Sequence, residues 1–138
     1  MRTCLLSLFC LFAVGCASDP EAFIPYIEGY WEIDQVFLYN GTQRSYSYND
    51  TIDYFEVTDS LRGFRKKMNP NFKGTFESSR DVAQFVLQIE NDSLNIIYNT
   101  PNSNWKESIL MANDSQLKII NQNKDVYLYR KYEPISID

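Results

Sequence analysis

Short runs with strand-like alternation, each ended by turn residues, fill the chain from residue 30 to residue 132. In the run at 82–89 (VAQFVLQI) the odd-numbered residues are all apolar, so one face of that strand is predicted to be buried. Asn40-Gly41, a dipeptide typical of two-residue hairpin loops, ends the first run. Because no stretch has the length and periodicity of a long helix, we expect an all-β domain.

The spacing of these runs predicts how the strands are arranged. The runs are 30–39, 52–58, 62–67, 72–77, 82–89, 94–99, 105–112, 116–120 and 126–132. Short strands joined by short turns are typical of a β-sandwich or an up-and-down barrel. The short turns favour a meander, so we predict an up-and-down antiparallel β-barrel of about eight strands. An unrelated β-sandwich with a buried Trp is the alternative.

The first fifteen residues have the pattern of a secretory signal peptide. Arg2 supplies a positive start, and residues 4–15 (CLLSLFCLFAVG) are mostly apolar and carry no charge. This segment is shorter than the roughly 20 apolar residues that a membrane-spanning helix needs. We therefore assign residues 1–15 to a signal peptide that is removed on export.

Residues 13–16 (AVGC) resemble the lipobox of bacterial lipoproteins, with Ala13 where Leu is most frequent. The resemblance implies cleavage before Cys16 and lipidation of its thiol. Cys4 and Cys10 lie within the signal peptide, so lipidation also accounts for the one cysteine left in the exported chain. An ordinary cleavable signal that ends near a cysteine is the alternative.

The expected anchor sets the location of the protein and its partners. Without Arg2, the chain carries 12 basic and 18 acidic residues, and this net charge of −6 repels nucleic acid and anionic headgroups. The membrane is therefore contacted through acyl chains (palmitate or similar) on Cys16. Ser18, in place of the Asp that marks inner-membrane retention in enterobacterial lipoproteins, favours the outer membrane. Residues 16–28 are a lipidated tether with a short helical turn that begins at Asp19-Pro20, and 29–138 are the barrel domain.

Gly29-Tyr30-Trp31, directly after the predicted helical turn, resembles the Gly-x-Trp signature that opens the first strand of lipocalins. In that family the Trp plugs the closed end of the barrel, and an Arg near the end of the last strand packs across its ring. Arg130 is the residue that the resemblance assigns to this role, since it lies on one strand face with Val126 and Leu128. The resemblance thus implies a lipocalin-like barrel closed by Gly29, Trp31 and Arg130.

Aromatic residues are abundant, and they suggest a ligand-binding cup. The candidate lining residues are Tyr54, Phe55, Phe72, Phe76, Phe85, Tyr98 and Trp105. An eight-stranded barrel is of a size that either fills itself or holds one small ligand. These rings therefore form either a pocket for a small hydrophobic or amphipathic ligand or a packed core.

A basic cluster stands out in this acidic chain, at Arg62, Arg65, Lys66 and Lys67. It has two interpretations. It binds a phosphate, a lipid headgroup or an acidic partner, or it is a solvated hairpin whose charges protect a sheet edge.

Catalysis is not expected from this sequence. The chain has no His, its one exported Cys is expected to be acylated, and no Gly-rich phosphate loop is present. We expect no enzyme activity, no cofactor, no metal site and no nucleic-acid partner. The leading hypothesis is an outer-membrane-anchored lipocalin-like lipoprotein that binds or carries a small hydrophobic ligand. The alternative is an accessory lipoprotein with a fully packed barrel that docks onto an outer-membrane protein assembly.

Replacing the anchor residue tests the export prediction. Cys16→Ser removes the thiol that accepts the lipid, so labelling with radioactive fatty acid should be abolished and the protein released or mislocalised. Gel autoradiography and membrane fractionation measure both effects. Labelling as strong as in the wild type would refute the anchor.

Overall fold

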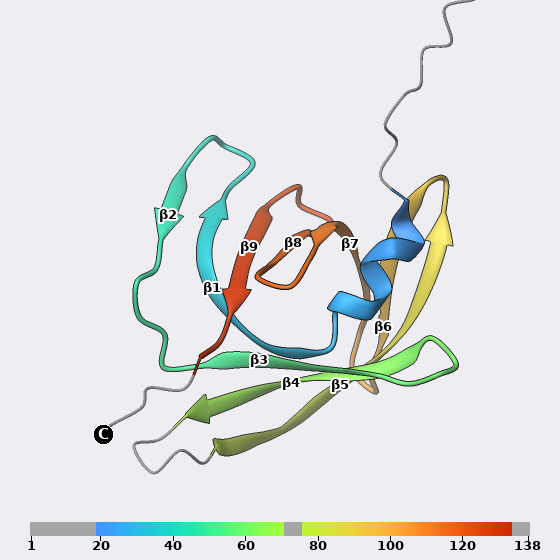
Figure 1. Ribbon diagram of the computed structural model, residues 1–138, viewed down its shortest axis with the longest axis horizontal. Coiled ribbons are helices and arrows are strands. Elements are labelled where there is room, and N and C mark those ends of the chain that lie inside the picture. Colours follow the sequence, from blue (N-terminus) through green and yellow to red (C-terminus); the bar gives the residue numbers. More distant parts are fainter. Residues whose placement is uncertain (1–18, 71–75, 134–138) are drawn as a thin grey trace, which may run out of the picture.

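The computed structural model describes residues 19–70 and 76–133. A short 3-10 helix, η1 (Pro20–Tyr26), is followed by nine strands (Figure 1). The strands are β1 (Gly29–Phe37), β2 (Gln43–Ser45), β3 (Ile52–Val57), β4 (Arg62–Pro70), β5 (Phe76–Glu90), β6 (Ser93–Asn99), β7 (Asn104–Ala112), β8 (Gln116–Ile120) and β9 (Val126–Lys131). Within these residues no helix has the length and apolar character needed to cross a membrane.

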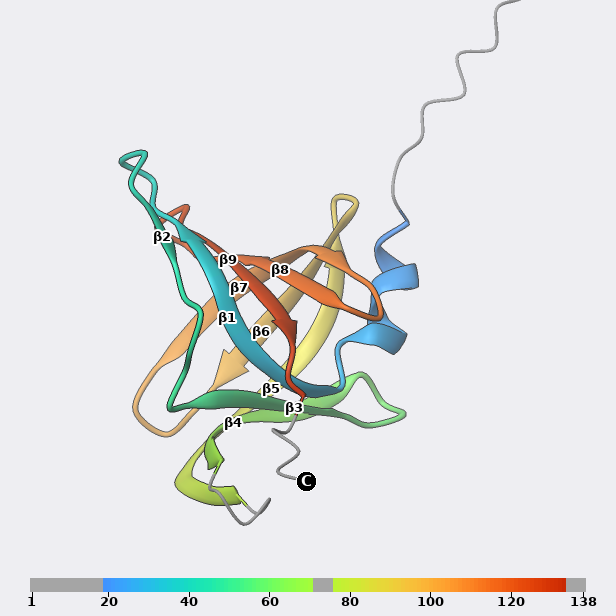
Figure 2. The same ribbon diagram turned by 60° about the vertical axis from the view of Figure 1, so that its left-hand side comes forward.

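The strands close into an antiparallel barrel, as the sequence predicts. Each of β3 to β8 pairs with the next strand along the chain, and β1 pairs with both β3 and β9. The first and last strands therefore meet, and eight strands form a complete ring (Figure 2). β2 is an additional short strand on β1, next to the region that pairs with β3. The runs expected at 72–77 and 82–89 both overlap the long strand β5.

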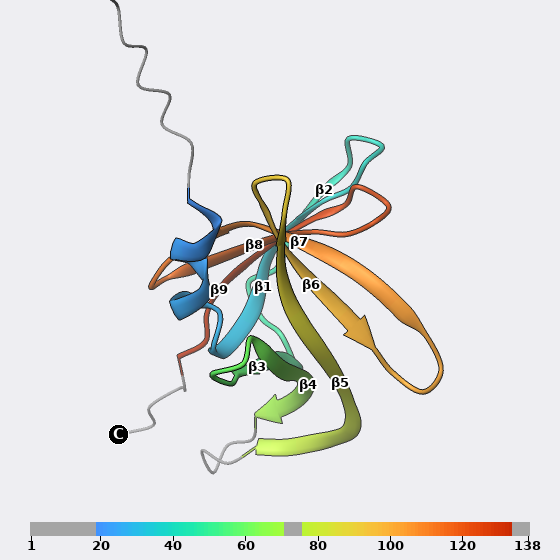
Figure 3. The same cartoon turned by 90° about the vertical axis from the view of Figure 1, so that its right-hand side faces the viewer.

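One half of the barrel is packed with apolar side chains. The cluster consists of Ile27, Trp31, Phe55, Phe85, Leu87, Leu94, Ile96, Tyr98, Ile109, Ala112, Leu117, Ile119 and Tyr129. η1 lies outside the barrel at this end, against β6 and β7 (Figure 3). The helix begins as predicted, because the side chain of Asp19 accepts a hydrogen bond from the Glu21 amide at 3.1 Å. We call the end of the barrel that carries η1 the closed end.

Trp31 lies at the centre of the closed end, with no exposed surface. Its indole N–H donates to the carbonyl oxygen of Ile27 at 2.9 Å, so the buried polar atom is satisfied. The ammonium group of Lys131 lies 4.5 Å from the centre of the Trp31 ring. Gly29 has φ +136°, a backbone conformation that is strained for residues with a Cβ, so this position favours glycine.

The cation over Trp31 is Lys131 and not Arg130, which corrects the expectation from the sequence. In the antiparallel pairing Lys131 lies opposite Trp31, and Arg130 lies opposite Glu32. Because alternate residues face opposite sides of a strand, Arg130 lies on the outer wall. There its guanidinium donates to Glu32 Oε1 at 2.8 Å and Asp34 Oδ1 at 2.9 Å. Arg130 therefore has its own carboxylate partners and makes no contact with the barrel plug.

Removing the Trp31 ring tests its role in closing the barrel. Trp31→Ala should lower the free energy of unfolding by about 3–5 kcal/mol, the usual loss when a large buried ring leaves a cavity. Urea unfolding followed by circular dichroism measures this. Trp105→Ala, which removes a ring that is only partly buried, is the matched control and should have a smaller effect. A loss below about 1 kcal/mol for Trp31→Ala would argue against a barrel plug.

Candidate functional site

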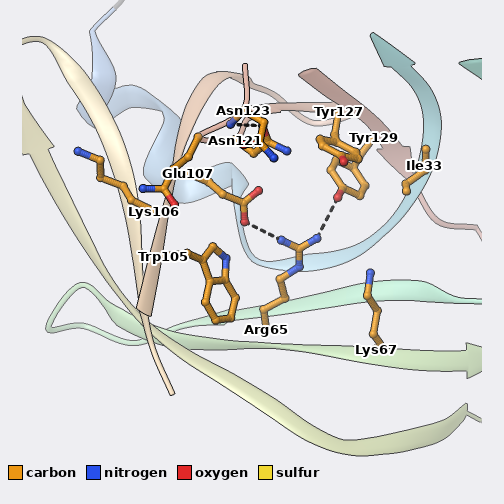
Figure 4. Close-up of a pocket in the computed structure, with 11 residues that line it drawn as sticks. Ile33, Arg65, Lys67, Trp105, Lys106, Glu107, Asn121, Asn123, Tyr127 and Tyr129 are labelled. Atoms are coloured by element: carbon orange, nitrogen blue, oxygen red, sulfur yellow. Dashed lines mark hydrogen bonds and ion pairs between the residues drawn. The ribbon is translucent and has the colours of Figure 1, made fainter. Parts of the chain in front are cut away.

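The other half of the barrel interior is not filled, and it forms a cavity of about 430 Å³ that is open to solvent. We call this cavity the cup. It is lined by Ile33, Arg65, Lys67, Trp105, Lys106, Glu107, Asn121, Gln122, Asn123, Tyr127 and Tyr129 (Figure 4). Trp105 is near the start of β7 and residues 121–123 follow the end of β8, whereas the closed end holds Ala112 and Leu117 from the other ends of these strands. The cup therefore opens at the end of the barrel opposite η1.

Strand pairing brings the charged residues of the cup together. On β4, Arg65 and Lys67 face inward with Gly63, and on β3 Asp53 and Phe55 face inward opposite Lys67 and Arg65. Gly63 is required here because a Cβ would collide with the Phe85 ring and the carbonyl group of Glu56. The alternation of two neighbouring strands thus places two cations and one carboxylate inside the barrel.

Arg65 is the centre of a hydrogen-bonded network that forms the floor of the cup. Its Nε donates to Asp53 Oδ1 at 3.2 Å. One terminal nitrogen donates to the Tyr98 hydroxyl and to Glu107 Oε1, both at 3.1 Å, and the other donates to the Tyr129 hydroxyl at 2.9 Å. We call these five residues the Arg65 network. In the described residues, every buried side-chain nitrogen or oxygen atom has a hydrogen-bond partner, and this includes those of the Arg65 network.

Two further contacts complete the surroundings of the network. The guanidinium carbon of Arg65 lies 4.9 Å from the centre of the Phe55 ring, in cation–π geometry. Lys67 Nζ lies 2.7 Å from Asp53 Oδ1, so this oxygen accepts from both cations. A buried guanidinium that is both hydrogen-bonded and stacked on a ring is positioned far more rigidly than a surface arginine.

Burial and neighbouring charges set the protonation states in the network. Burial alone would raise the pKa of Asp53, but the charges and hydrogen bonds of Arg65 and Lys67 outweigh it and hold this pKa below its usual value. Burial raises the pKa of both Tyr98 and Tyr129, although Arg65 opposes this. At neutral pH Asp53 is therefore ionised and the two phenols are protonated. They act as neutral hydrogen-bonding groups beside a charged guanidinium.

Among the predicted ligand-lining residues whose side chains the structure describes, Trp105 alone lines the cup. Its ring stacks on Tyr98, with centres 4.6 Å apart and planes 14° apart. Phe55, Phe85 and Tyr98 lie beneath the cup in the packed core, with at most 3% of their surface exposed. They support the floor instead of forming the wall of a pocket.

Of the other predicted residues, Tyr54 is described and lies away from the cup, whereas the side chains of Phe72, Phe76 and Cys16 are outside what the structure describes. Tyr54 lies on the outer wall, where its ring is 4.7 Å from that of Tyr30, which corrects the prediction that it faces a ligand. Phe76 begins β5, but the structure does not describe its side chain, and Phe72 and Cys16 lie outside the described residues.

Most of the polar residues in the cup are not predicted from the sequence. The sequence does not single out Asp53, and for Arg65 and Lys67 it leaves open an anion-binding cluster or a solvated hairpin. A signal was present, because Asp53 is in phase with Phe55 and Val57 on its strand. Glu107 is likewise in phase with Trp105 and Ile109. An acid in line with apolar residues on a strand is expected to be buried, and it then needs a cationic partner.

Comparison with known proteins identified one matching family. A family model described as a lipocalin-like domain matches residues 27–119. No curated protein matches the chain.

Solved structures also match this chain. A lipocalin-like protein from Bacteroides uniformis is 11% identical, with 77% of this chain and 98% of that chain covered and a TM-score of 0.48. An uncharacterized protein from Bacteroides eggerthii is also 11% identical, with coverage of 77% and 99% and a TM-score of 0.49.

Acid unfolding tests the ion pairs of Asp53. Because the pKa of Asp53 is lower in the folded chain than in the unfolded chain, its ionised form stabilises the fold at neutral pH. This stabilisation is lost as the pH falls below about 4, where the unfolded chain takes up the proton first. Asp53→Asn should therefore flatten the dependence of unfolding free energy on pH between about pH 5 and pH 2.

Urea unfolding at several pH values measures this dependence. Asp59→Asn, at an exposed turn residue, is the control and should keep the wild-type slope. The same slope for Asp53→Asn and the wild type would show that Asp53 gains nothing from Arg65 and Lys67.

Proposed function

Because the chain belongs to the lipocalin-like domain family, we propose that it is an outer-membrane lipoprotein, anchored through Cys16, that binds one small ligand in the cup. The observation that carries this proposal is the division of the barrel interior. The closed half is packed, and the open half leaves a cavity of about 430 Å³. Ligand pockets commonly have volumes of about 300–1,000 Å³.

The lining of the cup supports a ligand with both polar and apolar parts. Ile33 and Trp105 are the apolar side chains of the wall, and the others are charged, amide or phenol groups. This lining changes the expectation of a purely hydrophobic ligand, since an apolar molecule would remove water from these polar groups and offer them no partners. The ligand proposed here offers hydrogen-bond acceptors to the floor and a flat or apolar surface to Trp105.

The position of the tether supports an orientation on the membrane. Cys16 is three residues before Asp19, the N-cap of η1, and three extended residues span about 10 Å. η1 lies at the closed end, so a lipid on Cys16 would hold that end near the bilayer. The cup would then open away from the membrane and exchange its ligand with the aqueous phase.

The alternative, a docking lipoprotein with a fully packed barrel, agrees less well with this geometry. A fully packed interior is found in the closed half of the barrel but not in the half that contains the cup. We propose binding and not catalysis, because the charged groups of the cup are already joined to one another. The described residues contain no group of three or more His, Cys, Asp or Glu side chains that could hold a metal ion.

Native mass spectrometry tests the proposal on the lipoprotein extracted from its own membrane in mild detergent. We expect a fraction of the protein to retain a small molecule without a covalent bond. Trp105→Ala should lose this adduct, because it removes the ring that forms the apolar wall. Tyr26→Ala is the matched control, since it removes a partly exposed ring at the closed end and should keep the adduct.

The other outcomes separate the two functions. A protein free of any adduct, isolated together with a membrane protein, would support docking. An adduct that persists unchanged in Trp105→Ala would place the ligand outside the cup.

A further inference from the structure

We propose that the cup selects small organic anions, with Lys67 contacting the acid group and Trp105 contacting an apolar or aromatic body. This inference rests on the proposed function and adds the chemical class of the ligand. The basic cluster seen in the sequence is divided between the two faces of β4. Arg65 and Lys67 face the cup, whereas Lys66 lies on the outer wall over the rings of Tyr54 and Phe64.

The charged side chains at the floor of the cup differ in how far they are exposed. The side chains of Asp53 and Glu107 are only 3% and 10% exposed, and both accept hydrogen bonds from Arg65. The side chain of Arg65 is 15% exposed, and that of Lys67 is 54% exposed. Asp53 therefore lies deeper than the two cations, whereas Glu107 is part of the cup lining together with Arg65 and Lys67. Although these four charges sum to zero, the ligand would meet the positive side of the arrangement.

The two cations also keep hydrogen-bond donors that a ligand can use. Lys67 has three N–H donors, and its ion pair with Asp53 uses one of them. Arg65 has five N–H donors, of which four are directed at members of its network. The Tyr127 ring also lines the cup and adds a phenol (Figure 4). Donors thus remain for a ligand, while one oxygen of each carboxylate is engaged by Arg65.

An oxyanion is the ligand group that matches such a surface. Hydrogen bonds between an ammonium or guanidinium group and a carboxylate, phosphate or sulfonate are roughly twice as strong as neutral ones. Lys67 can turn toward such a group without exposing Asp53, because Asp53 keeps its bond to Arg65. The chain as a whole has a net charge of −5, so attraction for an anion must come from this local pair.

The rest of the ligand is defined by Trp105. One face of the ring is stacked on Tyr98, whose hydroxyl is held by Arg65, so the indole plane is fixed before any ligand binds. A preorganised aromatic surface loses little conformational entropy on binding. Ile33 provides a second apolar contact in the wall of the cup. An acid with an aromatic or compact apolar body would use both parts of the cup at once.

Isothermal titration calorimetry with two matched probes tests the proposal on the full lipoprotein in mild detergent. The probes are naphthalene acetate and its neutral amide, which differ only in the acid group. We expect the acid to bind about tenfold more tightly than the amide, since a hydrogen bond to a charged group contributes about that much. Added salt should reduce this preference.

Variants of β4 separate the acid group from the rest of the ligand. Lys67→Met should remove the preference, so that the acid and the amide bind with similar affinity, and Lys67→Arg should keep it. Lys66→Met, which removes the same charge from the outer wall one residue away, should bind both probes like the wild type. Thermal unfolding shows whether each variant is folded, and the exposure of Lys67 makes Lys67→Met compatible with folding.

Each failure has its own pattern. If both probes bind equally and Trp105→Ala abolishes both, the cup binds ligands but does not select anions. If Lys67→Met still binds the acid more tightly than the amide, Lys67 is not the group that contacts the acid group of the ligand. If neither probe binds, or if Trp105→Ala changes nothing, both the anion preference and the proposed function are contradicted.

Discussion

A buried arginine determines how the inside of this barrel is used. Arg65 is held on β4, and its partners Asp53, Tyr98, Glu107 and Tyr129 come from β3, β6, β7 and β9. One guanidinium therefore joins five of the eight strands across the interior. Moving such a charge out of water is unfavourable by several kcal/mol, and only a complete set of hydrogen bonds to opposite charges offsets this. The network consequently fixes the relative positions of these strands more than it adds stability.

The same network divides the interior into an apolar half and a polar half. Below it, Phe55 and Phe85 pack into the core that ends at Trp31. Above it, the remaining space is lined by groups that hydrogen-bond with water or a ligand, and it is left as a cup. An apolar core could not extend to the open end without leaving the guanidinium partly unpaired. The cup thus follows from the position of Arg65 in the middle of the barrel.

The sequence predicted the architecture well, because the turns and the alternation of apolar residues are local signals. The hairpin at Asn40-Gly41, the cap at Asp19 and the pairing of successive strands need no knowledge of distant contacts. Gly41 has φ +91°, a conformation that glycine adopts without strain. The closure of β1 on β9 followed only indirectly, from the predicted meander and the family resemblance, since no local pattern reports that two strands about 100 residues apart are paired.

The candidate site was harder to predict, because both faces of several strands contain apolar residues. On β9, Val126 and Leu128 suggested that their face points inward, and they assigned Arg130 to the interior. The inward face instead carries Tyr127, Tyr129 and Lys131, whose polar ends contribute to the cup or lie over Trp31. An error of one residue in a strand exchanges its two faces. The usual rule that the apolar face of a strand is buried therefore predicted the wrong inward face for β9, because part of the barrel interior is polar.

Arg130 has a structural role on the outside that complements the role of Arg65 inside. The wall between β2 and β3 is interrupted at residues 46–51, where the middle of β1 has no strand partner on this edge, although its other edge pairs with β9. Asp34 is the extra residue of a bulge at this place, and its carboxylate binds Arg130. Arg130 also donates to the carbonyl oxygens of Tyr46 and Ser47, at 2.9 and 3.2 Å.

These contacts substitute for the missing strand pairing. The amide of Tyr46 donates to the carbonyl oxygen of Asp34 at 2.8 Å, and the Asn49 side chain donates to that of Ile33 at 2.9 Å. Ile33 is a wall residue of the cup, so its backbone is fixed from outside by the segment that Arg130 holds. The bulge re-aims β1 so that Ile33 and Val36 both face inward although they are three residues apart. One arginine thus builds the floor of the cup, and a second keeps its wall closed where the sheet is interrupted.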